Sequence, residues 1–452
     1  MKILLYTDLT IRPDQLFWHR DLGLLTKAFR DLGHNALLVV HLATEPNPTP
    51  AVPNKLDHPR EQPCVAQQGL PRPSVAGPHS NIRAQARPAN AGQNSPVAGA
   101  LHSSDRYSES SEVGQPSYSP NNPVDPVLWV SQQDVLSPCW WKDHHPDLVI
   151  LGLWTRPKYD PIRRAALSAT PHVIERADSD GMRTASCGFL TYAKRRFDYF
   201  RDRSLRWPSP LSIPASIFYS FASILATPWI EYRLRKTLRL LPSILVETPM
   251  ATLLWKSLAS RLGVDPSKIH CVPHPIQTDI FKLAPAIPKK NQIISVGRWD
   301  SYQKNLPLLL KTLRSFLDKN PSWTSLVIGS GLPAKSPHPR ITFLPPVAPP
   351  DLARHMQNSK IFLSTSRYES FGLALAEANY CGCAAVELSP FAQLDCDSLF
   401  KKELPFVSSY NRLLTILLNA PTFFKPARAL PCRALEPLLV ARRILSIRHL
   451  LQ

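Results

Sequence analysis

Glycine is scarce in this chain of 452 residues, with 16 in all, and several short glycine and cysteine motifs are absent. A dinucleotide-binding fold places a Gly-x-Gly-x-x-Gly motif directly after its first strand. The loop at that position here, residues 8–14, contains no glycine, which disfavours a dinucleotide oxidoreductase. The eight cysteines include no Cys-x-x-Cys pair, so we expect no zinc site and interpret the cysteines as reduced thiols of a cytosolic chain.

Long uninterrupted apolar runs are also missing. The N-terminal run, residues 1–7, ends at Asp8 and is too short for a signal peptide. Residues 207–230 carry no charge, but prolines leave only residues 215–227 uninterrupted, which is too short for a membrane-spanning helix. Basic residues flank this segment on both sides, so we predict an interfacial segment that contacts an anionic membrane surface. A core helix of the first domain is the alternative.

The chain is rich in positive charge and in proline. The formal net charge of +19 favours an anionic partner, such as a sugar nucleotide or a phospholipid surface, although scattered solvated arginines are the alternative. Nucleic acid is disfavoured because aromatic and basic residues do not alternate on a recognisable platform. Residues 46–126 contain 15 of the 47 prolines and no Phe or Trp. Such a segment buries too little apolar surface to fold, and we predict a disordered insertion there.

The rest of the chain has the pattern of an α/β protein. A buried strand at residues 2–7, a helix at 16–32 and a strand at 36–42 form a β-α-β opening, typical of a doubly wound domain. Further apolar strands recur to residue 271, and a linker at residues 284–290 with two prolines separates a second α/β domain. Residues 435–451 predict an amphipathic terminal helix.

Candidate site residues of the second domain lie where its predicted strands end. Arg298 and Lys304 follow the strand at residues 292–296, and two cations on such a loop suit a diphosphate, although an exposed basic loop is the alternative. Residues 361–364 predict a strand that leads through Glu369 into a helix at residues 371–382, capped by Ser370. The free amides at that helix start suit a phosphate.

The first domain offers two weaker candidates. His19 lies near the start of the first helix, and a purely structural histidine is the alternative. Asp178 lies in the polar loop 176–183, directly after the strand at residues 172–175. Ligands of parallel sheets bind at this edge, whereas a simple turn built on Asp and Gly is the alternative.

Four motifs, taken in order, resemble those of the GT-B retaining glycosyltransferases of the glycosyltransferase family 4 type, also called glycosyl transferases group 1. They are Ser295-Val-Gly297-Arg298, Lys304-Asn305, Val327-Ile-Gly-Ser-Gly331 and Glu369-Ser-Phe-Gly-Leu-Ala-Leu-Ala-Glu377-Ala. The resemblance covers residues 291–392 well and residues 1–45 and 127–285 loosely. It implies two Rossmann-like doubly wound domains that face a cleft. The chain departs from the family pattern at two further places. Near the domain junction His274-Pro275 stands where the family commonly has Asn-Gly, and in the middle of the first domain residues 175–180 stand where the family often has a histidine.

The resemblance also implies roles for individual residues. Arg298 and Lys304 hold the donor diphosphate, Glu369 contacts the donor sugar, and Glu377 contacts the ribose hydroxyls. The predicted catalytic residues are Glu369, Asp178 and His19. The predicted donor-binding residues are Gly297, Arg298, Lys304, Gly331, Phe371, Gly372, Leu373 and Glu377. No metal or other cofactor is expected, because cationic side chains and the helix terminus stabilise the leaving diphosphate in this family.

The sequence therefore predicts a hexosyltransferase that moves a sugar with retention from a nucleotide-diphosphate sugar to a glycan or lipid-linked acceptor, in polysaccharide biosynthesis. The predicted domains are residues 1–45 and 127–284 for the N-terminal domain, 291–430 for the nucleotide-sugar domain and 431–452 for a terminal helix. The predicted location is the cytoplasm, peripheral at the inner face of the membrane. The alternatives are a sugar-nucleotide epimerase of the same fold and a non-catalytic GT-B binding or scaffold protein. A phosphorylase is disfavoured because no cofactor-lysine motif is present.

Overall fold

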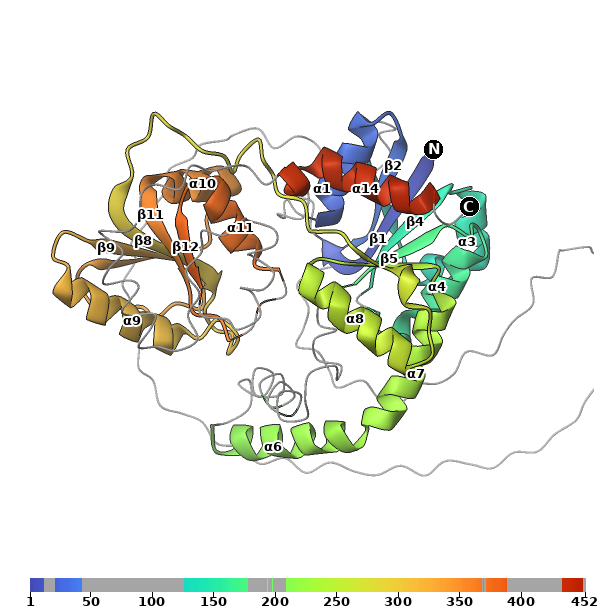
Figure 1. The fold of residues 1–452 in the computed structure, drawn as a ribbon, viewed down its shortest axis with the longest axis horizontal. Helices are drawn as coiled ribbons and strands as arrows, with labels where there is room; N and C mark the ends of the chain where they lie inside the picture. Colours follow the sequence, from blue (N-terminus) through green and yellow to red (C-terminus); the bar gives the residue numbers. More distant parts are fainter. Residues whose placement is uncertain are drawn as a thin grey trace, which may run out of the picture. The chain divides into compact units, whose positions relative to one another are not determined.

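Two parallel β-sheets organise the chain in a computed structural model (Figure 1). The structure describes residues 1–11, 21–42, 126–153, 155–177, 193, 197, 209–367, 369, 371–387 and 433–449. The predicted insertion, residues 46–126, lies outside them except for Pro126. The two parallel sheets with interleaved helices confirm the predicted α/β fold class, while the exact domain boundaries stay predictions.

The first sheet has seven strands in the order β3-β2-β1-β4-β5-β6-β7, and every neighbouring pair is parallel. Its strands are β1 (Lys2–Ile11), β2 (Asn35–Leu42), β3 (Val127–Val130), β4 (Leu148–Gly152), β5 (Val173–Arg176), β6 (Ser243–Val246) and β7 (Ile269–Cys271). Consecutive side chains of a strand point to opposite faces, so Ile3 and Leu5 enter one buried cluster whereas Leu4 and Tyr6 enter another. Both faces are therefore apolar, as a parallel sheet covered by helices on both sides requires.

Helices cover the two faces of this sheet. They are α1 (Asp21–Asp31), α2 (Gln132–Leu136), α3 (Pro138–Asp143), α4 (Asp160–Leu167), α7 (Thr227–Leu240), α8 (Pro249–Arg261) and α14 (Pro437–His449), with single 3₁₀ turns at Pro157–Tyr159, Pro266–Lys268 and Arg433–Leu435. The helix α6 (Ser209–Leu225) precedes α7 in the chain and contacts it. Four elements, β3, α2, α3 and α4, were not predicted from the sequence. These elements are short, from four to eight residues, and short segments carry little periodicity.

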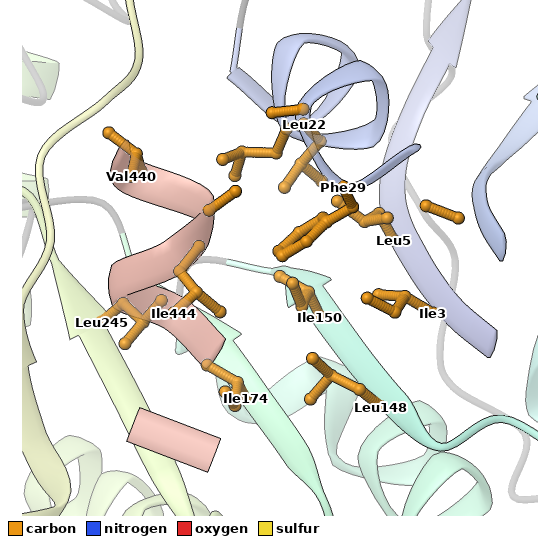
Figure 2. Close-up of a cluster of buried hydrophobic side chains, with 14 of the residues drawn as sticks. Ile3, Leu5, Leu22, Phe29, Leu148, Ile150, Ile174, Leu245, Val440 and Ile444 are labelled. Carbon is orange, nitrogen blue, oxygen red and sulfur yellow. The ribbon is translucent and has the colours of Figure 1, made fainter. Parts of the chain in front are cut away.

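The helix α14 packs on the core of the first sheet, although it follows the second sheet in the chain. Figure 2 shows Val440 and Ile444 of α14 in one cluster with Leu5 and Ile150 of the first sheet, and all four side chains are buried. Burying an aliphatic side chain of this size stabilises a fold by about 2 kcal/mol. The terminal helix is therefore part of the N-terminal core, which explains its apolar stripe.

The second sheet has five parallel strands in the order β10-β9-β8-β11-β12. Its strands are β8 (Lys290–Arg298), β9 (Thr324–Ser330), β10 (Ile341–Leu344), β11 (Ser359–Ser364) and β12 (Ala384–Glu387), and its helices are α9 (Leu306–Lys319), α10 (Pro349–Asn358) and α11 (Leu373–Tyr380). Since β8 and β11 are neighbours at the centre, the loops that follow them meet at one edge of the sheet.

The segment at residues 207–230 differs from its prediction. Pro214 was expected to break a helix there, yet α6 continues through it from Ser209 to Leu225. A proline removes one backbone hydrogen bond, and the exposed position of Pro214 lets water replace it. No single helix among the described residues is long and apolar enough to cross a membrane, while the pair Ile213–Ala222 and Thr227–Leu240, bent by 63°, meets the criteria of length and composition together.

Candidate active site

Two loops are fastened together at the carboxyl edge of the second sheet. The backbone amide of Arg367, after β11, donates to the carbonyl of Gln303, after β8, at 2.8 Å. The hydroxyl of Thr365 donates to the carbonyl of Lys304 at 3.3 Å, and the guanidinium of Arg367 donates to the side-chain oxygen of Asn305 at 3.1 Å. Side chains of both loops are thereby held in one place.

Lys304 and Glu369 form an ion pair in this place. The ammonium of Lys304 donates to one carboxylate oxygen of Glu369, and the amide of Gln303 approaches the other at 3.5 Å. The two charged side chains are only 20% and 11% exposed, so their attraction is screened less than that of a surface pair. Gly297 makes room for the lysine, because a Cβ atom there would lie 3.3 Å from Cγ and Cδ of Lys304.

The helix α11 presents its N-terminus beside these loops. Its N-cap is Gly372, whose φ of 77° lies in the left-handed region that favours glycine. The helix begins at Leu373, two residues after the predicted start, and the predicted cap Ser370 lies outside the described residues. The first amides of any helix lack partners within it and can donate to a phosphate. Leu373 is the first residue of this helix, and its role in donor binding stays a prediction.

Other predicted donor-binding residues have different surroundings. Arg298 is exposed at the end of β8. Phe371 is buried, and it packs with Leu375 in the core of the second domain. Glu377, in the middle of α11, is only 4% exposed. Of these three residues, Arg298 is the most accessible.

Gly331, a predicted donor-binding residue, and Gly329 lie where the backbone leaves no room for a side chain, and the binding role of Gly331 stays a prediction. A Cβ atom at Gly329 would lie 1.8 Å from the carbonyl oxygen of Gly297, and one at Gly331 would lie 2.5 Å from the amide of Asp300. Both glycines also have positive φ angles. They are needed because the ends of β8 and β9 approach each other closely.

The predicted residues of the first domain, His19 and Asp178, lie outside the described residues. Within the described part, a charged cluster occupies the carboxyl edge of the first sheet. The carboxylate of Asp21 contacts Nε of Arg176 at 2.8 Å and Nδ1 of His274 at 2.9 Å. Nε2 of His274 lies 3.3 Å from the carboxylate of Glu247. The departure His274-Pro275 thus brings an imidazole between two carboxylates.

These contacts change the pKa values of the cluster. Burial lowers the pKa of His274, but the charge of Asp21 opposes this more strongly than Arg176 supports it, and the hydrogen bonds to Asp21 and Glu247 contribute, so the pKa is raised to about 9. Burial raises the pKa of Asp21, but Arg176 and His274 outweigh it and hold that pKa well below its ordinary value. The imidazolium form of His274 is therefore the form that the fold stabilises near neutral pH.

A pH-dependent stability follows from His274. Because its folded pKa of about 9 exceeds the unfolded value of 6.5, this group contributes about 3 kcal/mol below pH 6.5, and the contribution is lost as the pH rises through 9. We expect His274→Gln to lower the unfolding midpoint most at pH 6 and least at pH 10, as thermal unfolding of both proteins would measure. A difference that stays constant from pH 6 to pH 10 would contradict a protonated His274.

The charged residues at the end of the strand at residues 172–176 were considered as part of a binding site, but Glu175 has a partner inside the fold. Glu175 is fully buried, and its carboxylate binds Nε and Nη2 of Arg163, each at 2.6 Å. Arg163 also binds Asp160 at 2.8 Å. Glu175 is thus committed to an ion pair within the fold, and of the described charged residues at this strand end only Arg176 belongs to the cluster around His274.

The contacts of Gln303, Arg367 and Tyr302 at this edge were not predicted from the sequence. The guanidinium of Arg367 lies 4.1 Å from the ring centroid of Tyr302, which adds a cation beside Lys304. The sequence held one signal for the role of Arg367, because this cation comes two residues before Glu369 in a loop that was already expected at the sheet edge. Among the described residues, no group of three or more His, Cys, Asp or Glu could hold a metal ion, and the expectation that none is needed stays a prediction.

Solved structures share this two-sheet architecture. The lipopolysaccharide outer core galactosyltransferase WaaB, in its apo form, is similar over 100% of this chain and 99% of its own, with 10% identity and a TM-score of 0.51. A sucrose-phosphate synthase from Thermosynechococcus elongatus matches with 13% identity over 99% of this chain and 94% of its own, at a TM-score of 0.49. The likeness to WaaB confirms the GT-B fold.

The pneumococcal O-GlcNAc transferase GtfA, solved with UDP and GlcNAc, is also similar, with 14% identity and a TM-score of 0.46 over 70% of this chain. This chain spans 58% of the length of that protein.

The amino-acid sequence itself matches a family model of glycosyl transferases. Residues 277–388 match the family described as glycosyl transferases group 1, and this segment includes Lys304, Glu369 and Glu377. The match confirms the predicted resemblance over this segment, whereas family 4 membership and retention stay predictions. No curated protein matches the chain.

Proposed function

We propose that this protein transfers a sugar, with retention, from a nucleotide-diphosphate sugar to a glycan or lipid-linked acceptor. The observation that carries the proposal is the ion pair of Lys304 and Glu369 beside the N-terminus of α11, within the segment that matches the glycosyl transferases. This arrangement offers a cation, a carboxylate and free amides to one bound molecule. A sugar diphosphate has complementary parts, namely hydroxyls for the carboxylate and phosphates for the cation and amides.

In this proposal the donor replaces part of the ion pair. The diphosphate accepts hydrogen bonds from the ammonium of Lys304, and Arg298 and the backbone amides of Gly372 and Leu373 are further donors. Glu369 then turns its free oxygen to the sugar hydroxyls, while Gln303 holds its other oxygen in place. As the bond to the sugar breaks, negative charge grows on the leaving diphosphate, and the fixed cation stabilises it most in the transition state.

The acceptor side is assigned to the first domain. The sheet edge with Asp21, Arg176 and His274 supports this assignment, because ligands of parallel sheets bind at the carboxyl ends of strands. We further propose a hexosyl donor, a role in polysaccharide biosynthesis, no metal requirement, and a cytoplasmic location with peripheral membrane contact.

A donor screen tests the proposal. Purified protein would be tested with UDP-, GDP- and ADP-sugars for thermal stabilisation and for donor hydrolysis, beside Glu369→Ala and Lys304→Ala. We expect one class of donor to stabilise the wild-type protein and the variants to lose hydrolysis. No stabilisation by any donor, or wild-type behaviour of both variants, would refute the proposal. Epimerised free donor would indicate the epimerase, and binding without turnover in the presence of acceptors would indicate the scaffold.

A further inference from the structure

Large apolar side chains are exposed on two consecutive helices, α6 and α7 (Figure 1). Eight of the thirteen exposed large hydrophobic residues of the described chain belong to them, each between 43% and 67% exposed. They are Ile213, Ile217, Phe218, Tyr219, Phe221, Leu225, Trp229 and Tyr232. Single exposed apolar residues are ordinary in soluble proteins, whereas eight of them on two consecutive helices indicate an interaction surface.

The apolar side chains of α6 form a stripe that faces outward. Ile213, Ile217, Phe221 and Leu225 are each four residues apart, so they lie along one face of the helix. Among the side chains of α6 whose burial the structure describes, the buried ones are those of Ser216, with no exposed surface, and Ser220. A helix of a water-soluble domain buries its apolar stripe and exposes its polar residues. The reversed pattern indicates that an apolar phase, and not water, contacts this face.

The next helix, α7, carries exposed positive charge. Its cations Arg233, Arg235, Lys236 and Arg239 are all exposed, and α6 has no charged residue. Two cations lie over exposed rings, Arg233 at 5.0 Å from the centroid of Trp229 and Lys236 at 4.6 Å from that of Tyr232. The acid Glu231 of this helix is neutralised by Arg261 at 2.7 Å. The exposed charge beside the apolar stripe is therefore positive.

We propose that α6 and the exposed side of α7 dock on the surface of an anionic lipid bilayer. The stripe of α6 enters the boundary between headgroups and acyl chains, the rings of Trp229 and Tyr232 lie at headgroup level, and Arg233 and Lys236 contact lipid phosphates. An anionic surface complements these cations, whereas a second copy of this basic chain would bring like charges together. The inference does not depend on sugar transfer, and it places the proposed lipid-linked acceptor on the surface that the protein binds.

Vesicle flotation of the full chain tests the proposal. The vesicles would contain either phosphatidylcholine alone or equal parts of phosphatidylcholine and phosphatidylglycerol, at low and high salt. We expect the protein to float with the anionic vesicles and to be released by salt. The variant Phe218→Ser/Phe221→Ser/Leu225→Ser should lower the partition coefficient at least about tenfold. Leu253→Ser, an equally exposed leucine on α8, is the matched control and should have no effect.

A variant without two of the cations tests the contribution of charge apart from that of the apolar stripe. Arg233→Gln/Lys236→Gln should weaken binding to anionic vesicles by about fivefold for each charge removed, and should not change binding to phosphatidylcholine. The replaced side chains are exposed, so the thermal midpoints of all variants should match that of the wild type. No flotation of the wild-type protein, or equal flotation of the triple serine variant, would overturn the proposal. So would a dimer that the triple serine variant dissociates while vesicles fail to bind, since this would identify a second copy as the occupant.

Discussion

Replacing Lys304 with alanine is expected to lower kcat/KM for sugar transfer by about two to three orders of magnitude, the range found when one preorganised donor to a developing anion is removed. The lysine lies at the edge of the second sheet, only 20% exposed, so bulk water cannot replace it fully as a partner of the diphosphate. Steady-state kinetics with the donor identified in the screen would measure this. Lys319→Ala, which removes an exposed lysine at the far end of α9, is the matched control.

Replacing Glu369, the partner of Lys304, should affect binding and transfer differently from replacing the lysine. Glu369→Gln removes the charge that Lys304 faces in the free protein, so the lysine becomes more available to a phosphate. We expect Glu369→Gln to bind the nucleoside diphosphate as well as the wild type or better, and to lose transfer by about a hundredfold or more. Equal losses of binding in Lys304→Ala and Glu369→Gln would show that the pair has only a structural role.

The second large effect concerns stability. Glu175→Ala is expected to lower the free energy of unfolding by about 3–5 kcal/mol, because it leaves Arg163 charged and buried without its main partner. Urea unfolding followed by circular dichroism would measure it. Arg163→Met/Glu175→Met removes both fully buried charges and should recover most of the loss, since Asp160, the other partner of Arg163, is part-exposed and keeps the hydroxyl of Thr237. A Glu175→Ala protein of unchanged stability that has lost transfer would instead identify Glu175 as a site residue.

The fold class could be predicted because each long element carries its own pattern. The strands at residues 36–42 and 292–296 were predicted from local apolar spacing, and β2 and β8 include them. The loop positions of Lys304 and Glu369 followed from the same pattern, since each comes after a buried strand. Local patterns failed for α6, where exposure to solvent lets a helix tolerate Pro214.

The partners within the sites could not be predicted, because they depend on contacts between distant residues. Lys304 and Glu369 are 65 residues apart, and His274 and Asp21 are 253 residues apart. Lys304 and Glu369 meet because the strand order places β11 beside β8, although β9 and β10 come between them in the chain. The strand that ends in Glu175 and Arg176 shows the same limit, because burial gave Glu175 a structural partner and Arg176 a place in the cluster of His274.

The central claim is that the edge of the second sheet at Lys304 and Glu369 binds the diphosphate of a nucleotide sugar. Calorimetric titration of UDP, GDP and ADP into the wild-type protein, Lys304→Ala and Lys319→Ala tests it most directly. The account predicts that at least one nucleoside diphosphate binds the wild type and Lys319→Ala equally, and binds Lys304→Ala about tenfold or more weakly, as loss of a charge-assisted contact requires. Binding that is the same in all three proteins, or no binding of any nucleoside diphosphate to the wild type, would contradict it.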